Sequence, residues 1–397
     1  MVNYFKRSFA VFSLLGFLFI PLTFLEFDFQ YQITKFIFYS PVAFIQNQFF
    51  PNAIKNIEFS SDTIGLNILL GLLLIISLLL VVGLRFFRVR TERIIPLFKL
   101  LSAYYVAIVF LKYGFDKIFK RQFYLPEPNI LYSNFGSLTR DTLFWSTMGT
   151  SHIYSIVTGA IEVLAGALIL FKRTRIAGFF LTLIVLVNIL LINIGFDISV
   201  KLFTSFLLMV VFFNLYAVLK TTYVFFIQHK AVQLPASVHN DIPVNKRVHA
   251  GLCAVIVGLV LTPAISTRNF NDDNTQRPLL HGAYQIEHFT VNNDSLNRND
   301  FPYRRFFIHR NDYIIFQKED ETMVDYFFEI NEGAKQMTIT DYENNKISVT
   351  YNYNAKESDL QLSFGNKAHW TIQSKALNWK ALPALQDGMH YTIDEIK

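Results

Sequence analysis

HIYSIVTGAIEVLAGALILF, residues 152–171, is long and apolar enough for one membrane crossing and carries a single carboxylate, Glu162. Lys172, Arg173 and Arg175 follow it directly. A carboxylate near mid-bilayer depth costs about 2.5–3.5 kcal/mol on insertion scales, so Glu162 needs a partner, a proton or a role. This stretch therefore predicts a membrane helix with a buried polar site.

The composition of the 397-residue chain divides at about residue 267. The apolar residues, 52% of the whole, concentrate before that point, where the net charge is +11, and the remainder carries −5. This pattern predicts an α-helical polytopic membrane protein with a soluble C-terminal domain. The acidic tail argues against nucleic-acid binding, which favours a basic soluble surface. The one cysteine, Cys253, excludes an internal disulfide or a CxxC redox pair.

Apolar runs predict about seven membrane spans. They are Phe9–Leu25, Ile64–Leu84, Leu100–Phe119, His152–Phe171, Ile176–Gly195, Ser199–Leu219 and Val248–Ile265. The first resembles a signal peptide after Lys6 and Arg7, but no small-residue cleavage site follows, so we expect an uncleaved anchor. The spans divide the membrane part into segments 1–99, 100–219 and 220–267, and a β domain is expected over 268–397.

Basic residues gather in alternate loops, which predicts a cytoplasmic N-terminus. Arg85, Arg88 and Arg93 lie between the second and third spans, and Lys172 and Arg173 lie between the fourth and fifth. Seven spans then place the C-terminal domain outside the cytoplasm of a bacterial inner (plasma) membrane, in the periplasm if the cell is Gram-negative. On the outer side, the aromatic segment Lys35–Asn47 is predicted either to lie along the interface or to pack as a loop. The longer segment Arg121–Thr150 is long enough to cap the bundle.

The tail has the short alternating segments of an antiparallel barrel or sandwich of about eight strands. Asp359–Phe364, for example, places Leu360, Leu362 and Phe364 on one face. The other predicted strands are Gly282–Val291, Phe306–Arg310, Tyr313–Gln317, Met323–Ile330, Lys346–Tyr353 and His369–Ile372. Leu377–Leu385 is predicted as one helical turn or a loop.

Small residues surround Glu162 on its helix face. Gly159, Ala165 and Gly166 lie three or four residues away, so a neighbouring helix can approach and Glu162 should point into the bundle. Lys112 is the preferred partner, with Asp116 one turn further along its helix. A polar pocket opening towards the soluble domain is predicted from the candidate set Glu162, Lys112, Asp116, Asn188, Asn193, Asp197 and Lys201.

Structural explanations compete with this site. Glu162 and Lys112 would also serve as an ion pair that holds two helices in register. Asp197 or Ser199 would also cap the sixth span, and Lys117, Lys120 and Arg121 would also be interfacial residues with extended side chains. Asn188 and Asn193 are often interhelical hydrogen-bonding residues rather than ligands.

No motif in the sequence assigns a catalytic residue or a metal. The tail histidines lack metal-ligand spacing, and no phosphate loop, nucleophile elbow or HExxH occurs. No cofactor is evident from the residues, and whether the chain is an enzyme is left open.

Three segments carry a resemblance to a known family. They are Lys112–Ile118 (KYGFDKI), Gly159–Gly166 (GAIEVLAG) followed by Lys172–Arg175, and the series Asn188, Asn193, Asp197 and Lys201. Over about residues 100–219 the chain resembles the DoxX-like four-helix membrane proteins, some of which belong to quinone-linked oxidoreductases. The resemblance implies a quinone and a redox protein partner. The tail opening Leu280–Glu287 (LHGAYQIE) is similar to lipocalin-like tails on longer bacterial relatives.

Three functions follow as hypotheses. The first is a membrane subunit of a quinone-linked redox system with a proton or ligand site at Glu162. The second is a non-enzymatic envelope scaffold or ligand-binding protein that acts through the β tail. The third is a small-solute transporter, although no inverted repeat or broken span is evident. The lipid bilayer is the one partner that the residues predict directly, and the sequence does not identify a small-molecule ligand.

Overall fold

The computed structural model of the chain describes residues 2–22, 28–52, 56–89, 91–233, 242–292, 294–295, 301–365, 369–386 and 392. The chain forms two compact units. Unit 1 comprises Met1–Gln122 and Ser155–Phe270, and unit 2 comprises Phe123–Tyr154 and Asn271–Lys397. The segment between two membrane helices thus belongs to the same unit as the C-terminal domain.

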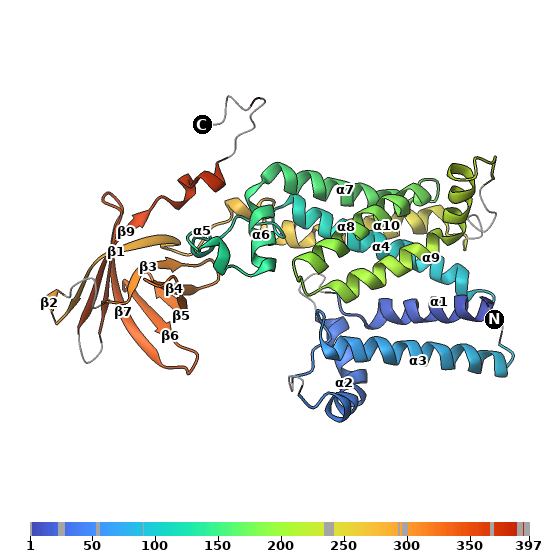
Figure 1. Ribbon diagram of the computed structural model, residues 1–397, viewed down its shortest axis with the longest axis horizontal. Coiled ribbons are helices and arrows are strands. Elements are labelled where there is room, and N and C mark those ends of the chain that lie inside the picture. The colour runs from blue at the N-terminus through green and yellow to red at the C-terminus, as the bar shows by residue number, and fades with distance from the viewer. Residues whose placement is uncertain are drawn as a thin grey trace. The chain divides into compact units, whose positions relative to one another are not determined.

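Unit 1 is a bundle of long apolar helices (Figure 1). Its described helices are α1 (Val2–Phe19), α2 (Phe29–Phe49), α3 (Ile64–Phe86), α4 (Ile94–Ile118), α7 (His152–Leu170), α8 (Arg175–Gly195), α9 (Lys201–Phe226) and α10 (Lys246–Thr267). Among the described residues, the six helices α3, α4, α7, α8, α9 and α10 are long and apolar enough to cross a membrane. The predicted fold class, a multi-pass helical membrane protein with a β domain, is confirmed.

The N-terminal span differs from its prediction. Helix α1 begins at Val2 and ends at Phe19, whereas the predicted span was Phe9–Leu25. Residues 23–25 of that prediction lie outside the described residues. Lys6 and Arg7 fall inside the helix, and α1 is not among the six candidate spans.

The segment predicted at the interface, Lys35–Asn47, lies within helix α2. Its buried residues recur every four positions and mark one packed face: Thr34, Phe38, Val42 and Gln46. Phe36 and Phe44 are exposed on other faces. The segment is therefore helical, and its position along a membrane surface stays a prediction.

The core of unit 1 is aromatic where α1, α4 and α9 meet. Phe9 of α1 stacks on Phe213 of α9 with ring centroids 4.8 Å apart, and Phe17 stacks on Tyr105 of α4 at 4.2 Å. Offset stacking of this kind adds to the gain from apolar burial. These contacts fix α1 to the bundle even though it is not one of the six candidate spans.

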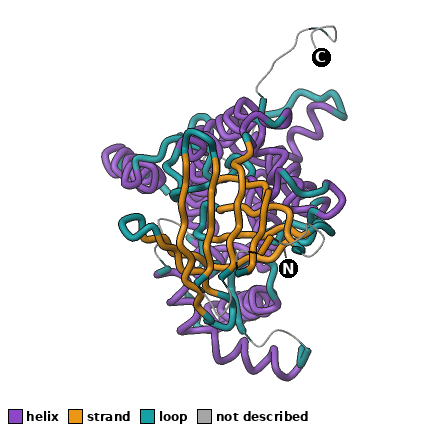
Figure 2. Tube along the Cα trace, turned by 90° about the vertical axis from the view of Figure 1, so that its left-hand side faces the viewer, coloured by secondary structure: helices purple, strands orange, loops and turns teal. Residues whose placement is uncertain are grey.

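Unit 2 contains an eight-stranded antiparallel barrel. Its described strands are β1 (Gly282–Val291), β2 (Asp294–Ser295), β3 (Tyr303–Ile308), β4 (Tyr313–Lys318), β5 (Met323–Asn331), β6 (Gln336–Thr340), β7 (Lys346–Asn354), β8 (Asp359–Phe364) and β9 (Trp370–Leu377). Neighbours in sequence pair in order from β3 to β9, and β1 pairs with both β3 and β9, which closes the barrel. The short β2 extends β1 alone. Figure 2 shows these strands, in orange, gathered in one body.

Strand alternation fills the inside of the barrel. Phe306 and Ile308 of β3, Ile314 and Phe316 of β4 and Leu360 of β8 belong to one buried cluster to which all eight barrel strands contribute. A barrel of eight strands is just wide enough for its own side chains to fill it. The interior is therefore a packed hydrophobic core.

A second apolar layer covers the outside of β1, β3 and β4. Ala283, Phe307 and Ile315 point outwards there and are covered by Trp379 and by side chains from the Phe123–Tyr154 segment, including Leu131. That segment contains α5 (Pro128–Leu131), η1 (Phe135–Ser137) and α6 (Arg140–Thr150). The predicted turn at Leu377–Leu385 forms two 3-10 turns, η5 (Trp379–Ala381) and η6 (Pro383–Leu385). A further 3-10 turn, η3 (Asp272–Asn274), precedes β1.

Candidate functional site

Helices α4 and α7 of unit 1 cross at two glycines. A Cβ placed on Gly159 would lie 2.5 Å from the carbonyl oxygen of Gly114, and one on Gly114 would lie 2.8 Å from that of Gly159. Further along, a Cβ on Gly166 would lie 3.0 Å from the carbonyl oxygen of Ala107. The contacting residues rise from Gly159 to Gly166 along α7 and fall from Gly114 to Ala107 along α4, so the two helices run antiparallel. Their backbones touch because neither crossing position carries a side chain.

Glu162 forms a buried ion pair at this crossing, with Lys117. The Lys117 Nζ atom donates to Glu162 Oε2 at 2.8 Å, and the two residues are 7% and 4% exposed. The Ser155 hydroxyl also donates to the Lys117 carbonyl oxygen at 2.8 Å. Glu162 thus points into the bundle.

The predicted partner Lys112 was wrong. Lys112 pairs with Asp116 on its own helix. Gly114 faces α7, and Lys117, three residues later, shares that face, whereas Lys112 lies two residues before Gly114 and points elsewhere. The glycine therefore marks which lysine of α4 meets α7, a signal available in the sequence.

The pair lies well inside the membrane helices. Glu162 is the eleventh residue of α7, about 15 Å along the helix axis from its start. Helical side chains lean towards the N-terminus of their own helix. Since α4 and α7 are antiparallel, Lys117 leans inwards from the last turn of α4 and Glu162 leans to meet it.

One aromatic ring of α4 borders the pair. The Lys117 Nζ atom lies 5.9 Å from the centre of the Tyr113 ring. Two turns before Tyr113, the Tyr105 hydroxyl is buried without a hydrogen-bond partner among the described residues, and its ring stacks on Phe17 of α1. The α4/α7 site, defined as Tyr113, Lys117 and Glu162, therefore holds a buried ion pair beside an aromatic ring.

The other predicted site residues make separate contacts. Asn193 of α8 donates to the Thr204 hydroxyl of α9 at 2.9 Å, and both are buried. Lys201 pairs with Asp197 at 2.9 Å. Asn188 is exposed on the surface of α8. No contact among the described residues joins these three groups to Glu162.

The start of α9 is capped by a residue that the sequence did not suggest. Asp62 accepts from the backbone N–H groups of Lys201 at 2.9 Å and Leu202 at 2.8 Å. A carboxylate at this position satisfies free amides and complements the helix dipole. The expected caps Asp197 and Ser199 do not do this, because the N-cap residue is Val200.

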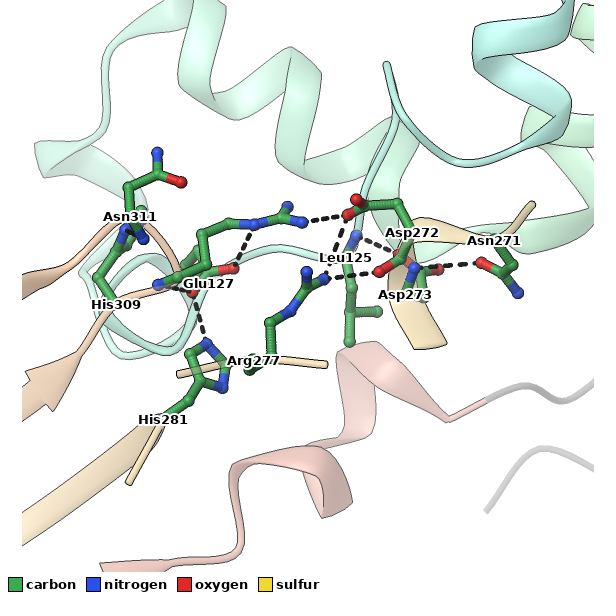
Figure 3. Close-up of polar contacts among 10 residues, drawn as sticks. Leu125, Glu127, Asn271, Asp272, Asp273, Arg277, His281, His309 and Asn311 are labelled. Carbon is green, nitrogen blue, oxygen red and sulfur yellow. Dashed lines mark hydrogen bonds and ion pairs between the residues drawn. The ribbon is translucent and has the colours of Figure 1, made fainter. Parts of the chain in front are cut away.

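A second polar cluster lies within unit 2, around Glu127 (Figure 3). The Glu127 Oε2 atom lies 2.8 Å from His281 Nε2 and accepts from the Arg310 backbone N–H at 3.3 Å. Its Oε1 atom lies 3.5 Å from Arg310 Nε. The side chains of Glu127 and His281 are 5% and 8% exposed. Both carboxylate oxygens are therefore occupied by cationic or N–H groups.

Asp272 extends the cluster from Arg310 to Arg277. Its carboxylate contacts the guanidinium of Arg310 and lies 3.2 Å from that of Arg277. Next to it, Asp273 accepts from the Leu125 backbone N–H at 2.7 Å. The cluster thus ties the Leu125–Glu127 segment to the residues that lead into β1 and to the end of β3.

The electrostatics of this cluster favour an ionised Glu127. Burial alone would raise the pKa of Glu127, but the hydrogen bond from His281 and the charges of His281, His309 and Arg310 lower it below its usual range. Burial lowers the pKa of His309, as do the nearby charges of His281, Arg310 and Arg277, against the opposing effect of Glu127. The cluster therefore fastens two parts of unit 2 together.

Sequence reasoning missed this cluster because its members are far apart in the chain. Glu127 and His281 are separated by 154 residues, and no local spacing relates them. Among the described residues, no group of three His, Cys, Asp or Glu side chains could hold a metal ion.

Comparisons with known proteins find a similarity that covers part of the chain. The uncharacterised protein YwoB of Bacillus subtilis (strain 168) is 35% identical over 97 residues, which are 24% of this chain and 61% of YwoB. The chain therefore spans about three fifths of that relative's length. No family model and no solved structure matches the chain. The chain is a multi-pass membrane protein with distant, partial similarity to YwoB.

Proposed function

We propose that the chain is a membrane subunit of a quinone-linked redox system, in which Glu162 exchanges protons with a lipid-soluble quinone. The observation that carries this proposal is the buried Lys117–Glu162 pair, 2.8 Å long and well inside the membrane helices. Ionisable residues within membrane helices commonly mark proton, ion or ligand pathways. Buried pairs are also weak sources of stability, since apolar replacements are often neutral or stabilising.

Helix α4 also carries a donor that suits a carbonyl ligand. The Tyr105 hydroxyl, on the part of α4 that packs on α1, is buried without a partner among the described residues, and a quinone oxygen is an acceptor. A benzoquinone or naphthoquinone ring enters from the lipid without crossing water. The resemblance to DoxX-like proteins over residues 100–219 points to the same class of ligand.

The proposed reaction needs one redox protein partner to supply its electrons. Two electrons from a partner redox protein and two protons delivered in turn by Glu162 convert a quinone to a quinol. Each delivery converts the Glu162 carboxylic acid to its carboxylate, which Lys117 stabilises, and a proton taken up from water restores the acid before the next delivery. The protein's own residues move only protons.

Calorimetric titration of the purified full-length protein with decylubiquinone tests the proposal. The natural chain should bind, and Glu162→Gln should bind at least tenfold more weakly because the amide cannot form the ion pair. Lys112→Met is the matched control, since Lys112 contacts Asp116 and not Glu162. Absence of binding by the natural chain, or equal binding by Glu162→Gln, would falsify the proposal.

A second candidate function, a non-enzymatic envelope scaffold, is favoured by the filled barrel. Buried side chains from all eight barrel strands occupy its interior, which favours contact with a protein over capture of a ligand. Under this function, removal of residues 271–397 should abolish complementation of a deletion strain, while Glu162→Gln should not. Full complementation by the truncated chain would exclude it.

A further inference from the structure

Asn188 places an amide on the outer surface of a membrane helix. It is the fourteenth of the 21 residues of α8, and its side chain is exposed. It makes no side-chain hydrogen bond among the described residues. Lipid tails offer no hydrogen bonds, so an amide at this depth is stabilised by a polar group on another membrane helix.

The residues around Asn188 form a continuous face. Ala177, Leu181, Ile184, Asn188, Leu191 and Gly195 follow one another at alternating spacings of four and three. All of them are exposed or half-buried, with Ile184 at 67% and Leu191 at 64%. This seven-residue repeat is the pattern by which two helices pack along their length, and one asparagine within it fixes register and the number of helices. We call these six residues the α8 face.

Most of the α8 face is uncovered by the described residues, and Leu181 alone of the six packs partly against the bundle core. Helix α8 packs into the bundle through its opposite side, where Thr182, Leu186 and Asn193 are buried. Only 28% of the most apolar stretch of α8 is buried, compared with 44% of the corresponding stretch of α4. A Cβ on Gly195 would meet nothing within 4 Å, so a second helix can approach closely at that end.

We infer that the α8 face is a self-association interface on which a second copy of this chain packs. Copies inserted in the same direction carry Asn188 at the same depth. An amide both donates and accepts, so two of them satisfy each other across a two-fold axis normal to the membrane. Another membrane protein would do so only if it presented a polar group at that depth. This inference does not rest on the proposed quinone function.

Cysteine cross-linking in native membranes tests the face. In a Cys253→Ser background, single cysteines at Ile184 and Leu191, which leave Asn188 in place, should form disulfide-linked dimers on oxidation. Leu79 of α3 is the matched control, because it is equally exposed at 66% and lies on another helix. Dimers of twice the chain mass at the α8 positions, at least fivefold above Leu79, support the inference. No dimer, an equal yield at Leu79, or cross-links solely to a different protein would overturn it.

Energy transfer between labelled copies of the full chain in lipid vesicles tests whether the Asn188 amide contributes to association. Asn188→Leu should weaken association about 3- to 30-fold, which corresponds to about 0.6–2 kcal/mol for an interhelical hydrogen bond in a membrane. Asn188→Gln should retain most of it, because the amide is kept. Unchanged association in Asn188→Leu would remove the proposed role of Asn188. Because the residue is exposed, both variants should fold as the natural chain does.

Discussion

The Lys117–Glu162 pair gives a sharp prediction about stability. Lys117→Met and Glu162→Leu each remove one charge and leave the other inside the membrane bundle. The two charged atoms are 2.8 Å apart and both residues are less than 9% exposed. At an effective dielectric constant of about 20, their attraction is about 6 kcal/mol before desolvation is counted.

Desolvation decides how the double variant changes the free energy of unfolding. Removing one partner of a buried pair costs about 3–5 kcal/mol, because the remaining charge is uncompensated. Removing both charges at once should return the free energy of unfolding to within about 1 kcal/mol of the natural value, since apolar replacement of a buried pair is often neutral. The coupling energy of the two substitutions should therefore exceed about 2 kcal/mol.

The single cysteine makes the assay specific for unit 1. Cys253 lies on α10, which packs on α4, and its thiol becomes fully accessible to a thiol-reactive dye when the bundle unfolds. Heating the full chain with such a dye should show each single variant melting about 6–20 °C lower, at about 2–4 °C per kcal/mol. Additive losses in the double variant, with a coupling energy below about 0.5 kcal/mol, would refute the reasoning that each charge depends on the other.

Three further predictions concern the helix crossing and the Glu127 cluster. Gly159→Ala should lower the free energy of unfolding of unit 1 by about 1–3 kcal/mol through overpacking, because its Cβ would lie 2.5 Å from a carbonyl oxygen. Gly71→Ala should leave the melting temperature of unit 1 unchanged, since its Cβ would meet nothing within 4 Å. Glu127→Gln should destabilise unit 2 by about 3 kcal/mol, measured in guanidinium by the emission of the three tryptophans, which all belong to unit 2; unchanged emission curves would contradict this. The same measurement should show the stability of unit 2 decreasing in two stages as the pH is lowered. Protonation of His309 is disfavoured in the folded state, so stability declines as the pH falls below its unfolded pKa of about 6.5. The contribution of Glu127, present above about pH 4.5, is lost as the pH falls through its lowered folded pKa. A flat profile from pH 7.5 to 3 would show that neither group has a different pKa in the folded and unfolded states.

Local sequence patterns predicted most of the fold. Apolar runs of about 20 residues predicted α3, α4, α7, α8, α9 and α10, because a bilayer requires that length. Alternation predicted most of the barrel, and Gly282–Val291 and Asp359–Phe364 match β1 and β8 at both ends. Strand β6, Gln336–Thr340, was missed because five residues with only Met337 and Ile339 buried give too little alternation to stand out.

Partners across long separations were not predictable in the same way. The site prediction placed Glu162 inside the bundle, which its neighbouring small residues indicate. Its partner depended on which face of α4 meets α7, and that is decided by the contact of Gly114 with Gly159. The Glu127–His281 contact depends on the folding of the Phe123–Tyr154 segment onto the barrel, for which no periodicity in the sequence gives a register.

Asn188 and Asn193 show how helix geometry separates residues that look alike in sequence. They are five positions apart on α8, a rotation of about 140°, so they cannot line one pocket. Asn193 faces the bundle and donates to Thr204, while Asn188 faces outwards with no side-chain hydrogen bond among the described residues. An inward amide that is satisfied within the chain stabilises the bundle. An outward amide at membrane depth gains its hydrogen bonds only when a second chain arrives, so the same residue type that holds α8 to α9 on one side drives association on the other.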